Sequence, residues 1–86
     1  MERVRLYGVA VTDINCRLLV TSLIAEGTPE TLGIAERISQ GVTQHGSVTA
    51  LTPAERDALL RSFPKRAPNA LLPLREALQK DQRARA

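Results

Sequence analysis

With 86 residues, the chain is long enough for one hydrophobic core and too short for two, so we expect a single domain. Aromatic residues make up only 2% of it, so the core must be built from aliphatic side chains. A single cysteine excludes an intramolecular disulfide and a zinc site built from several thiolates, which indicates a reducing, cytoplasmic setting. The N-terminal residues lack the apolar stretch of a secretory signal, and no segment approaches the roughly 20 apolar residues of a membrane span.

Two short apolar alternations open the chain. Val4 and Leu6 are at even-numbered positions, Val9 and Val11 are at odd-numbered positions, and a glycine lies between the two pairs. A bulge at that glycine would reset the register of an extended segment. The pattern predicts a strand over residues 3–11 that is broken near its middle.

Two helices are predicted next. Thr12 can act as an N-cap, the apolar residues after it indicate a helix over about residues 14–26, and Gly27 is typical of a helix stop. Pro29 suits the first position of a second helix, because that position needs no N–H partner. This second helix is expected over about residues 29–43.

The second half contains the clearest local signal in the chain. After a short predicted strand at residues 47–51, Thr52 and Glu55 have the spacing of a capping box, in which each side chain accepts a bond from the other's backbone N–H. They predict a helix over about residues 53–62. Following a proline-bracketed basic connector, a fourth helix is expected over about residues 70–82.

A similar pattern occurs twice, 40 positions apart. The identities are Thr12 with Thr52, Leu19 with Leu59, Ser22 with Ser62 and Glu36 with Glu76. The order strand, helix, helix therefore recurs, and we predict a mainly helical α+β domain with four helices, a small two-stranded ribbon and a (βαα)2 pseudo-repeat. Coincidence is the alternative, because capping threonines recur in unrelated proteins. The domain is expected over residues 1–80, with the end of the last helix fraying into a basic tail over residues 81–86.

Charge differs between the two halves. The net charge is +3, but residues 8–47 carry two arginines against four carboxylates, whereas residues 48–86 carry eight basic side chains against four acidic ones. A basic surface suits either a polyanion or an acidic patch on a protein. Pairs at i,i+4 spacing, such as Asp57 with Arg61, neutralise part of it, and no aromatic residues interleave the cations to stack bases. The candidate polyanion-binding residues are Arg61, Lys65, Arg66, Arg83 and Arg85.

Catalytic residues are scarce in the sequence. His45 is the only histidine and lies in a predicted turn without a nearby carboxylate or nucleophile. Cys16 falls early in an apolar helix, where a thiol usually acts as a small hydrophobic side chain. No phosphate-binding loop or metal-spaced cluster is present. We therefore expect no enzymatic activity, no cofactor, no metal and no small-molecule substrate.

The first predicted helix is apolar on most sides, so it must be covered on most sides. Either it is the central element of the domain, or a second chain buries part of it. The candidate interface residues are Leu19, Val20, Leu23 and Ile24. Strand pairing between subunits through residues 3–7 is a second route to a homodimer.

Two segments resemble small uncharacterised proteins of high-GC bacteria: the run from Glu26 to Ile38 and the run from Leu51 to Leu60. The excess of arginine over lysine, ten against two, agrees with that coding bias. The similarity spans about residues 9–78 and implies no activity, so it assigns no functional residues. The sequence as a whole predicts a non-enzymatic module that associates with itself or with another protein, with nucleic-acid binding as the alternative.

Overall fold

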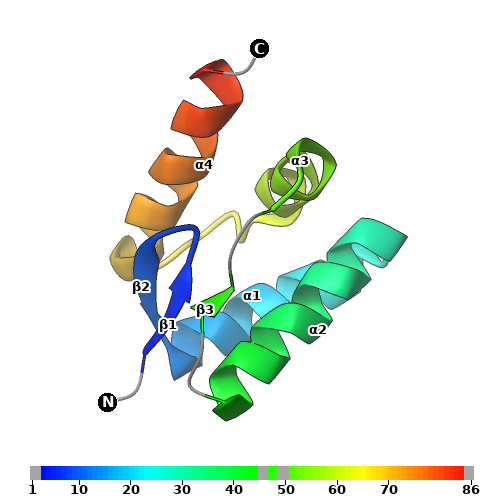
Figure 1. The fold of residues 1–86 in the computed structure, drawn as a ribbon, viewed down its shortest axis with the longest axis vertical. Coiled ribbons are helices and arrows are strands. Elements are labelled where there is room, and N and C mark those ends of the chain that lie inside the picture. Colours follow the sequence, from blue (N-terminus) through cyan, green and yellow to red (C-terminus); the bar gives the residue numbers. More distant parts are fainter. Residues whose placement is uncertain (1–2, 45–46, 49–50, 85–86) are drawn as a thin grey trace.

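A β-hairpin, a third short strand and four helices make up the part of the chain that the computed structural model describes, residues 3–44, 47–48 and 51–84 (Figure 1). This confirms the predicted α+β, mainly helical class. The elements in chain order are β1 (Arg3–Leu6), β2 (Val9–Thr12), α1 (Asp13–Glu26), α2 (Pro29–Gln44), β3 (Ser47–Val48), α3 (Pro53–Ser62), the 3-10 turn η1 (Asn69–Leu71) and α4 (Leu72–Ala84).

The first strand segment is two strands, not one broken strand. β1 and β2 pair antiparallel, with Val4 opposite Val11 and Leu6 opposite Val9. The turn between them uses positive φ angles at Tyr7 (52°) and at the glycine after it (82°), a conformation that matches the twist of a tight hairpin. Because the chain reverses direction, all four apolar side chains share one face, although their spacing along the sequence is out of phase.

β1 is the central strand of a three-stranded sheet in the order β2-β1-β3. Arg5 pairs with Ser47 and Leu6 with Val48 in the parallel sense, so the two halves of the chain meet here. The antiparallel ribbon itself, however, lies wholly within the first half. β3 thus covers the second edge of β1 at Arg5 and Leu6, so part of the segment 3–7 that was predicted to pair between subunits is paired within the chain.

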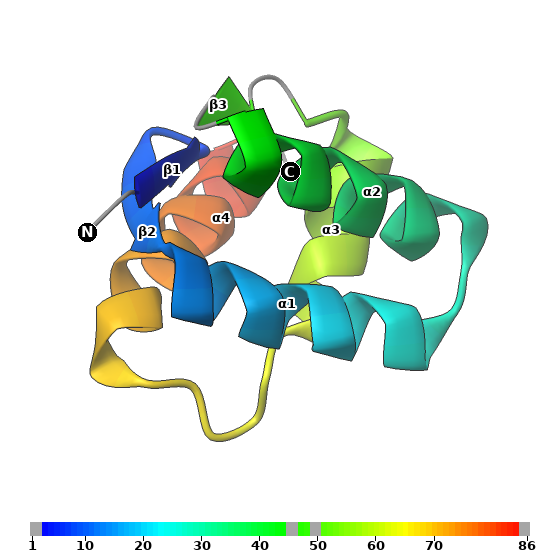
Figure 2. The same ribbon diagram turned by 90° about the horizontal axis from the view of Figure 1, so that it is seen from below.

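α1 and α2 lie side by side as an antiparallel pair (Figure 2). Gly27 ends α1 in the left-handed conformation, with φ of 73°, and its N–H donates to Leu23 O at 3.1 Å, as the stop signal predicted. Thr28 and Thr31 start α2 by accepting each other's backbone N–H at 2.9 and 3.2 Å. Thr31 thus takes the place that an acidic residue has in a capping box.

The capping box of α3 forms as predicted. Thr52 Oγ1 accepts from the Glu55 N–H at 3.1 Å, and a Glu55 carboxylate oxygen accepts from the Thr52 N–H at 2.9 Å. This bond, with Arg37 at 2.8 Å, holds the pKa of Glu55 below its usual value. A lowered pKa adds stability that is present at neutral pH and is lost as the pH falls through that pKa.

The order of elements recurs in the two halves, but the arrangement does not. Thr12 and Thr52 both precede a helix with extended backbone, yet only Thr52 makes a side-chain cap. α1 and α2 are joined at Gly27 and pack along their lengths, whereas α4 follows a long connector and points in a different direction (Figure 1). α4 also continues to Ala84, so residues 81–84 are helical where a frayed tail was predicted.

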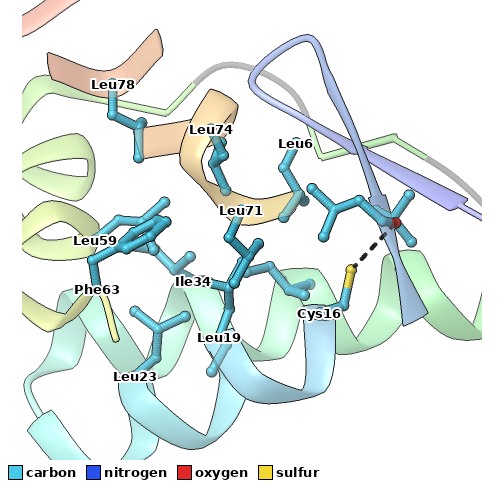
Figure 3. Packing of buried hydrophobic residues seen from close by; sticks show 14 of the residues in the cluster. Leu6, Cys16, Leu19, Leu23, Ile34, Leu59, Phe63, Leu71, Leu74 and Leu78 are labelled. Carbon is cyan, nitrogen blue, oxygen red and sulfur yellow. Dashed lines mark hydrogen bonds between the residues drawn. The ribbon is translucent and has the colours of Figure 1, made fainter. Parts of the chain in front are cut away.

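One largely aliphatic core contains side chains from the β-hairpin, α1, α2, α3, η1 and α4 (Figure 3). Leu19 and Leu23 of α1 belong to this cluster, and each is 0% exposed. No described helix combines the length and the apolar character that crossing a bilayer requires. The buried apolar side chains are Val4, Leu6, Val11, Cys16, Leu19, Leu23, Ile34, Ala35, Ile38, Ala58, Leu59, Phe63, Leu71, Leu74 and Leu78.

The different caps of the two threonines give a direct test of the fold. Thr52→Ala removes a side-chain acceptor from the start of α3 and is expected to lower the free energy of unfolding by about 1 kcal/mol. Thr12→Ala removes no cap and is the matched control, expected to cost less. Urea unfolding of both variants measures the difference, and equal losses would contradict the assignment of the cap.

Candidate functional site

The most exposed large apolar side chains of the described part of the chain all belong to α1 and α2. Ile14 is 70% exposed, Ile24 56% and Leu32 46%. Single exposed hydrophobic residues are ordinary, but three on one helical pair in so small a domain mark that pair for attention. The outward side of the α1–α2 pair is therefore the candidate site.

The local sequence explains why these side chains stay outside. α1 buries a stripe made of Cys16, Leu19 and Leu23, which recur at three- and four-residue steps. Ile24 directly follows a buried position and is rotated by about 100° from it, since a helix turns once in 3.6 residues. The body of α1 therefore lies between the Ile24 side chain and the core, and Ile24 stays exposed.

A groove of about 380 Å³ lies between α1 and α2. Val20 and Val42 supply its half-buried apolar walls, whereas Arg17, Thr21 and Ser39 supply polar groups. Its volume falls in the range of about 300–1,000 Å³ that is usual for binding sites. We call the surface formed by this groove and the exposed side chains beside it the hairpin face, after the helical hairpin of α1 and α2 and not the β-hairpin. Its residues are Arg17, Val20, Thr21, Ile24, Leu32, Ser39 and Val42.

The hairpin face has two different ends. At the connected end, where α1 and α2 join, Glu26 and Glu30 are exposed. At the open end, Arg17 is exposed, and within the described part of the chain no ion pair joins it to Asp13 one turn earlier. Asp13 instead has its Oδ1 atom buried without a hydrogen-bond partner. Glu26 is nine residues, or two and a half helical turns, from Arg17, so the two side chains lie on opposite sides of α1.

The four predicted interface residues divide between the core and the surface. Leu19 and Leu23 are fully buried in the chain's own core, so they offer no surface to a partner. Val20 is half-buried on the groove and Ile24 is exposed. The sequence prediction missed Leu32 as a surface residue because Leu32 fits the apolar stripe of α2, and only the packing of α2 shows that it lies at the rim of that stripe.

The two candidate reactive residues differ in what can be said of them. Cys16 is 0% exposed, as predicted, and its Sγ lies 3.9 Å from Val11 O (Figure 3). Burial, with a further contribution from the negative charge of Asp13, raises the pKa of the thiol to about 11, so the thiolate is scarce at neutral pH. His45 lies outside the described residues. Within those residues, no group of three or more His, Cys, Asp or Glu side chains could hold a metal ion.

A charged cluster joins α3 to α4 and was not predicted. Arg56 is only 5% exposed, and its guanidinium lies 2.9 Å from Asp81 and 3.1 Å from Asp57. Gln82 donates to Asp57 at 3.0 Å. The hydrogen bond from Gln82, then that from Arg56, lowers the pKa of Asp57, and Arg61 adds to the effect at the predicted i,i+4 spacing. Since every group has a partner on the neighbouring helix or its own, the cluster is a structural clamp.

The predicted polyanion-binding residues do not form one patch. Arg61, Lys65 and Arg66 are exposed near the end of α3 and in the connector after it. Arg83 is exposed on the last turn of α4, at the end remote from that connector (Figure 1). Arg85 lies outside the described residues. The structure therefore groups three of the five and separates Arg83 from them.

Comparison with models of protein families, with curated proteins and with solved structures found no match to this chain.

The clamp between α3 and α4 can be tested by removing its central charge. Arg56→Ala leaves Asp57 and Asp81 without their buried partner, so it is expected to lower the melting temperature clearly more than Lys80→Ala, which removes an exposed cation of α4 outside the cluster. Because the pKa of Asp57 is lowered, the deficit should be full at neutral pH and shrink as the pH falls through the titration of that carboxylate. Equal melting temperatures for both variants would show that the clamp adds nothing.

Proposed function

We propose that this protein acts without catalysis, as a protein-binding module that uses the hairpin face. The single observation that carries the proposal is the concentration of exposed apolar side chains on α1 and α2, beside a groove that has room for a partner's side chains. Burial of such side chains is the main source of affinity at protein interfaces. The cytoplasm is the compartment that fits this role, since the only cysteine needs no disulfide partner.

The residues of the face support binding rather than chemistry. Its polar members are an arginine, a threonine and a serine, and Thr21 Oγ1 is engaged in a bond to Arg17 O at 2.9 Å. Cys16 beneath the groove is held as a neutral thiol by its raised pKa. An apolar centre with a polar rim is the usual composition of a protein interface.

Self-association gives the first test of this role. We expect the protein to associate weakly between about 10 μM and 1 mM, and Ile24→Asp to raise the dissociation constant about tenfold or more because it replaces an exposed apolar side chain of the face by a charge. Ala54→Asp adds the same charge at an exposed position of α3 and is the control. Light scattering and sedimentation measure both, and a strictly monomeric protein that also fails to bind an apolar dye would count against the proposal.

Nucleic-acid binding is the second candidate function. The observation that favours it is the exposure of Arg61, Lys65 and Arg66 around the connector, none of which takes part in an ion pair within the described part of the chain. Clustered cations of this kind release counterions from phosphates on binding.

Titration against duplex and single-stranded DNA and RNA at two salt concentrations distinguishes the two functions. If the basic connector binds phosphates, affinity falls steeply with salt, and Lys65→Ala with Arg66→Ala weakens binding to all sequences alike. The variant Lys65→Arg, which keeps the positive charge, should retain affinity. An absence of salt-sensitive binding would remove the alternative.

A further inference from the structure

The hairpin face takes three of its side chains from one side of α1. Arg17, Val20 and Ile24 are spaced i, i+3 and i+7, so they lie within about 60° of one another around the helix axis. Leu32 and Ser39 of α2 are also seven residues apart and lie within about 20° of each other. The face thus consists of two rows of side chains, one from each helix.

The two rows match in level along the helical pair. Ile24 lies three residues before Gly27 and Leu32 five residues after it, so the antiparallel packing brings these exposed side chains to a similar level near the connected end. Arg17 and Ser39 lie seven residues from them on their own helices, about 10 Å toward the open end. The face therefore has an apolar half and a half that contains the arginine.

Arg17 brings an unpaired positive charge to the groove. Among the described residues that line the groove it is the only charged one, and within the described part of the chain its guanidinium takes part in no ion pair. The carboxylates closest to the groove residues along the two helices belong to Asp13, whose Oδ1 is buried, and Glu36, which lies about 60° further round α2 than Ser39. Neither lines the groove, so the charge complementary to Arg17 is expected on the partner.

A helix is the form of partner that suits this surface best. The backbone N–H and C=O groups of α1 and α2 are bonded within those helices, so an extended segment in the groove would bury its own backbone groups without partners. A helix satisfies its backbone internally and packs against other helices at about 8–10 Å between axes. A small molecule in the groove would leave Ile24 and Leu32 uncovered, because neither lines it, whereas a helix laid along the pair covers both.

We infer that the partner of the hairpin face is an amphipathic helix of another protein, which packs apolar side chains on Ile24 and Leu32 and places a carboxylate against Arg17. This inference rests on the protein-binding role proposed above. The apolar and acidic groups of the partner then lie about 10 Å apart, which is two turns of a helix. A second copy of this chain fits less well, because each described helix already buries its own apolar stripe in the core.

A pair of designed peptides tests the inference with the whole chain. The first is an alanine-rich helix of about 20 residues with leucines at i, i+3 and i+7 and a glutamate one turn beyond each end of that stripe, so that either orientation offers a carboxylate to Arg17. The matched peptide has lysines in place of the glutamates. At low salt, with the protein below about 10 μM to avoid self-association, fluorescence anisotropy is expected to show about fivefold tighter binding of the glutamate peptide.

Variants of the protein assign that preference to the face. Arg17→Glu should reverse it, so that the lysine peptide binds more tightly, whereas Lys80→Glu makes the same change of charge at an exposed position of α4 and should leave it as it is. Ile24→Asp should weaken both peptides about tenfold. A proline in the middle of the glutamate peptide should also weaken binding about tenfold or more, because it breaks the helix.

The outcomes separate this inference from the proposed function. Equal affinity for the two peptides, or a preference that Arg17→Glu leaves unchanged, would overturn the acidic partner, and undiminished binding of the proline peptide would overturn the helical one. In either case the protein-binding role stands if Ile24→Asp weakens the peptides. If neither peptide binds with the protein at about 1 mM, the inference fails. The proposed function fails with it only if the protein is also strictly monomeric and binds no apolar dye.

Discussion

Burial of the inner stripe of α1 is the interaction on which the rest of the structure depends. Leu19 and Leu23 are fully buried in the same cluster as side chains from the β-hairpin and the other helices, so one face of α1 contributes to a largely aliphatic core in which Phe63 is the aromatic member. The burial of this stripe also determines which side chains of α1 are exposed. Once these leucines point inward, Ile14 and Ile24 must point outward, because the helix period separates them from the buried positions.

Charged contacts close the domain around that small core. Arg37 pairs with Glu55 between α2 and α3, and Arg56 pairs with Asp81 between α3 and α4. A core of short aliphatic side chains buries little area per residue, so helices at its border gain orientation from directional contacts. α4 is held by two kinds of contact. Its buried leucines pack into the core, and the ion pair of Arg56 with Asp81 fixes the part near its end.

The proposed function grows out of this division of α1 into two sides. The hairpin face combines exposed apolar side chains with a groove that also has polar lining residues, and both features suit a protein partner. The basic connector after α3 is a separate surface with different chemistry. Because the two surfaces belong to different elements, substitutions on one leave the other intact, and their roles can be measured independently.

Local chemistry within a few residues determined much of this protein from sequence alone. Caps at Thr52 and Gly27 set helix boundaries, since each cap is a contact between near neighbours. Tertiary structure decided the rest. Only the reversal at Tyr7 made one predicted strand into a hairpin, and only packing separated Leu19, which is buried, from Ile24, which is exposed. The residue type of an apolar side chain does not show whether it lies on the buried or the exposed side of a helix, because the neighbours that cover it come from distant parts of the chain.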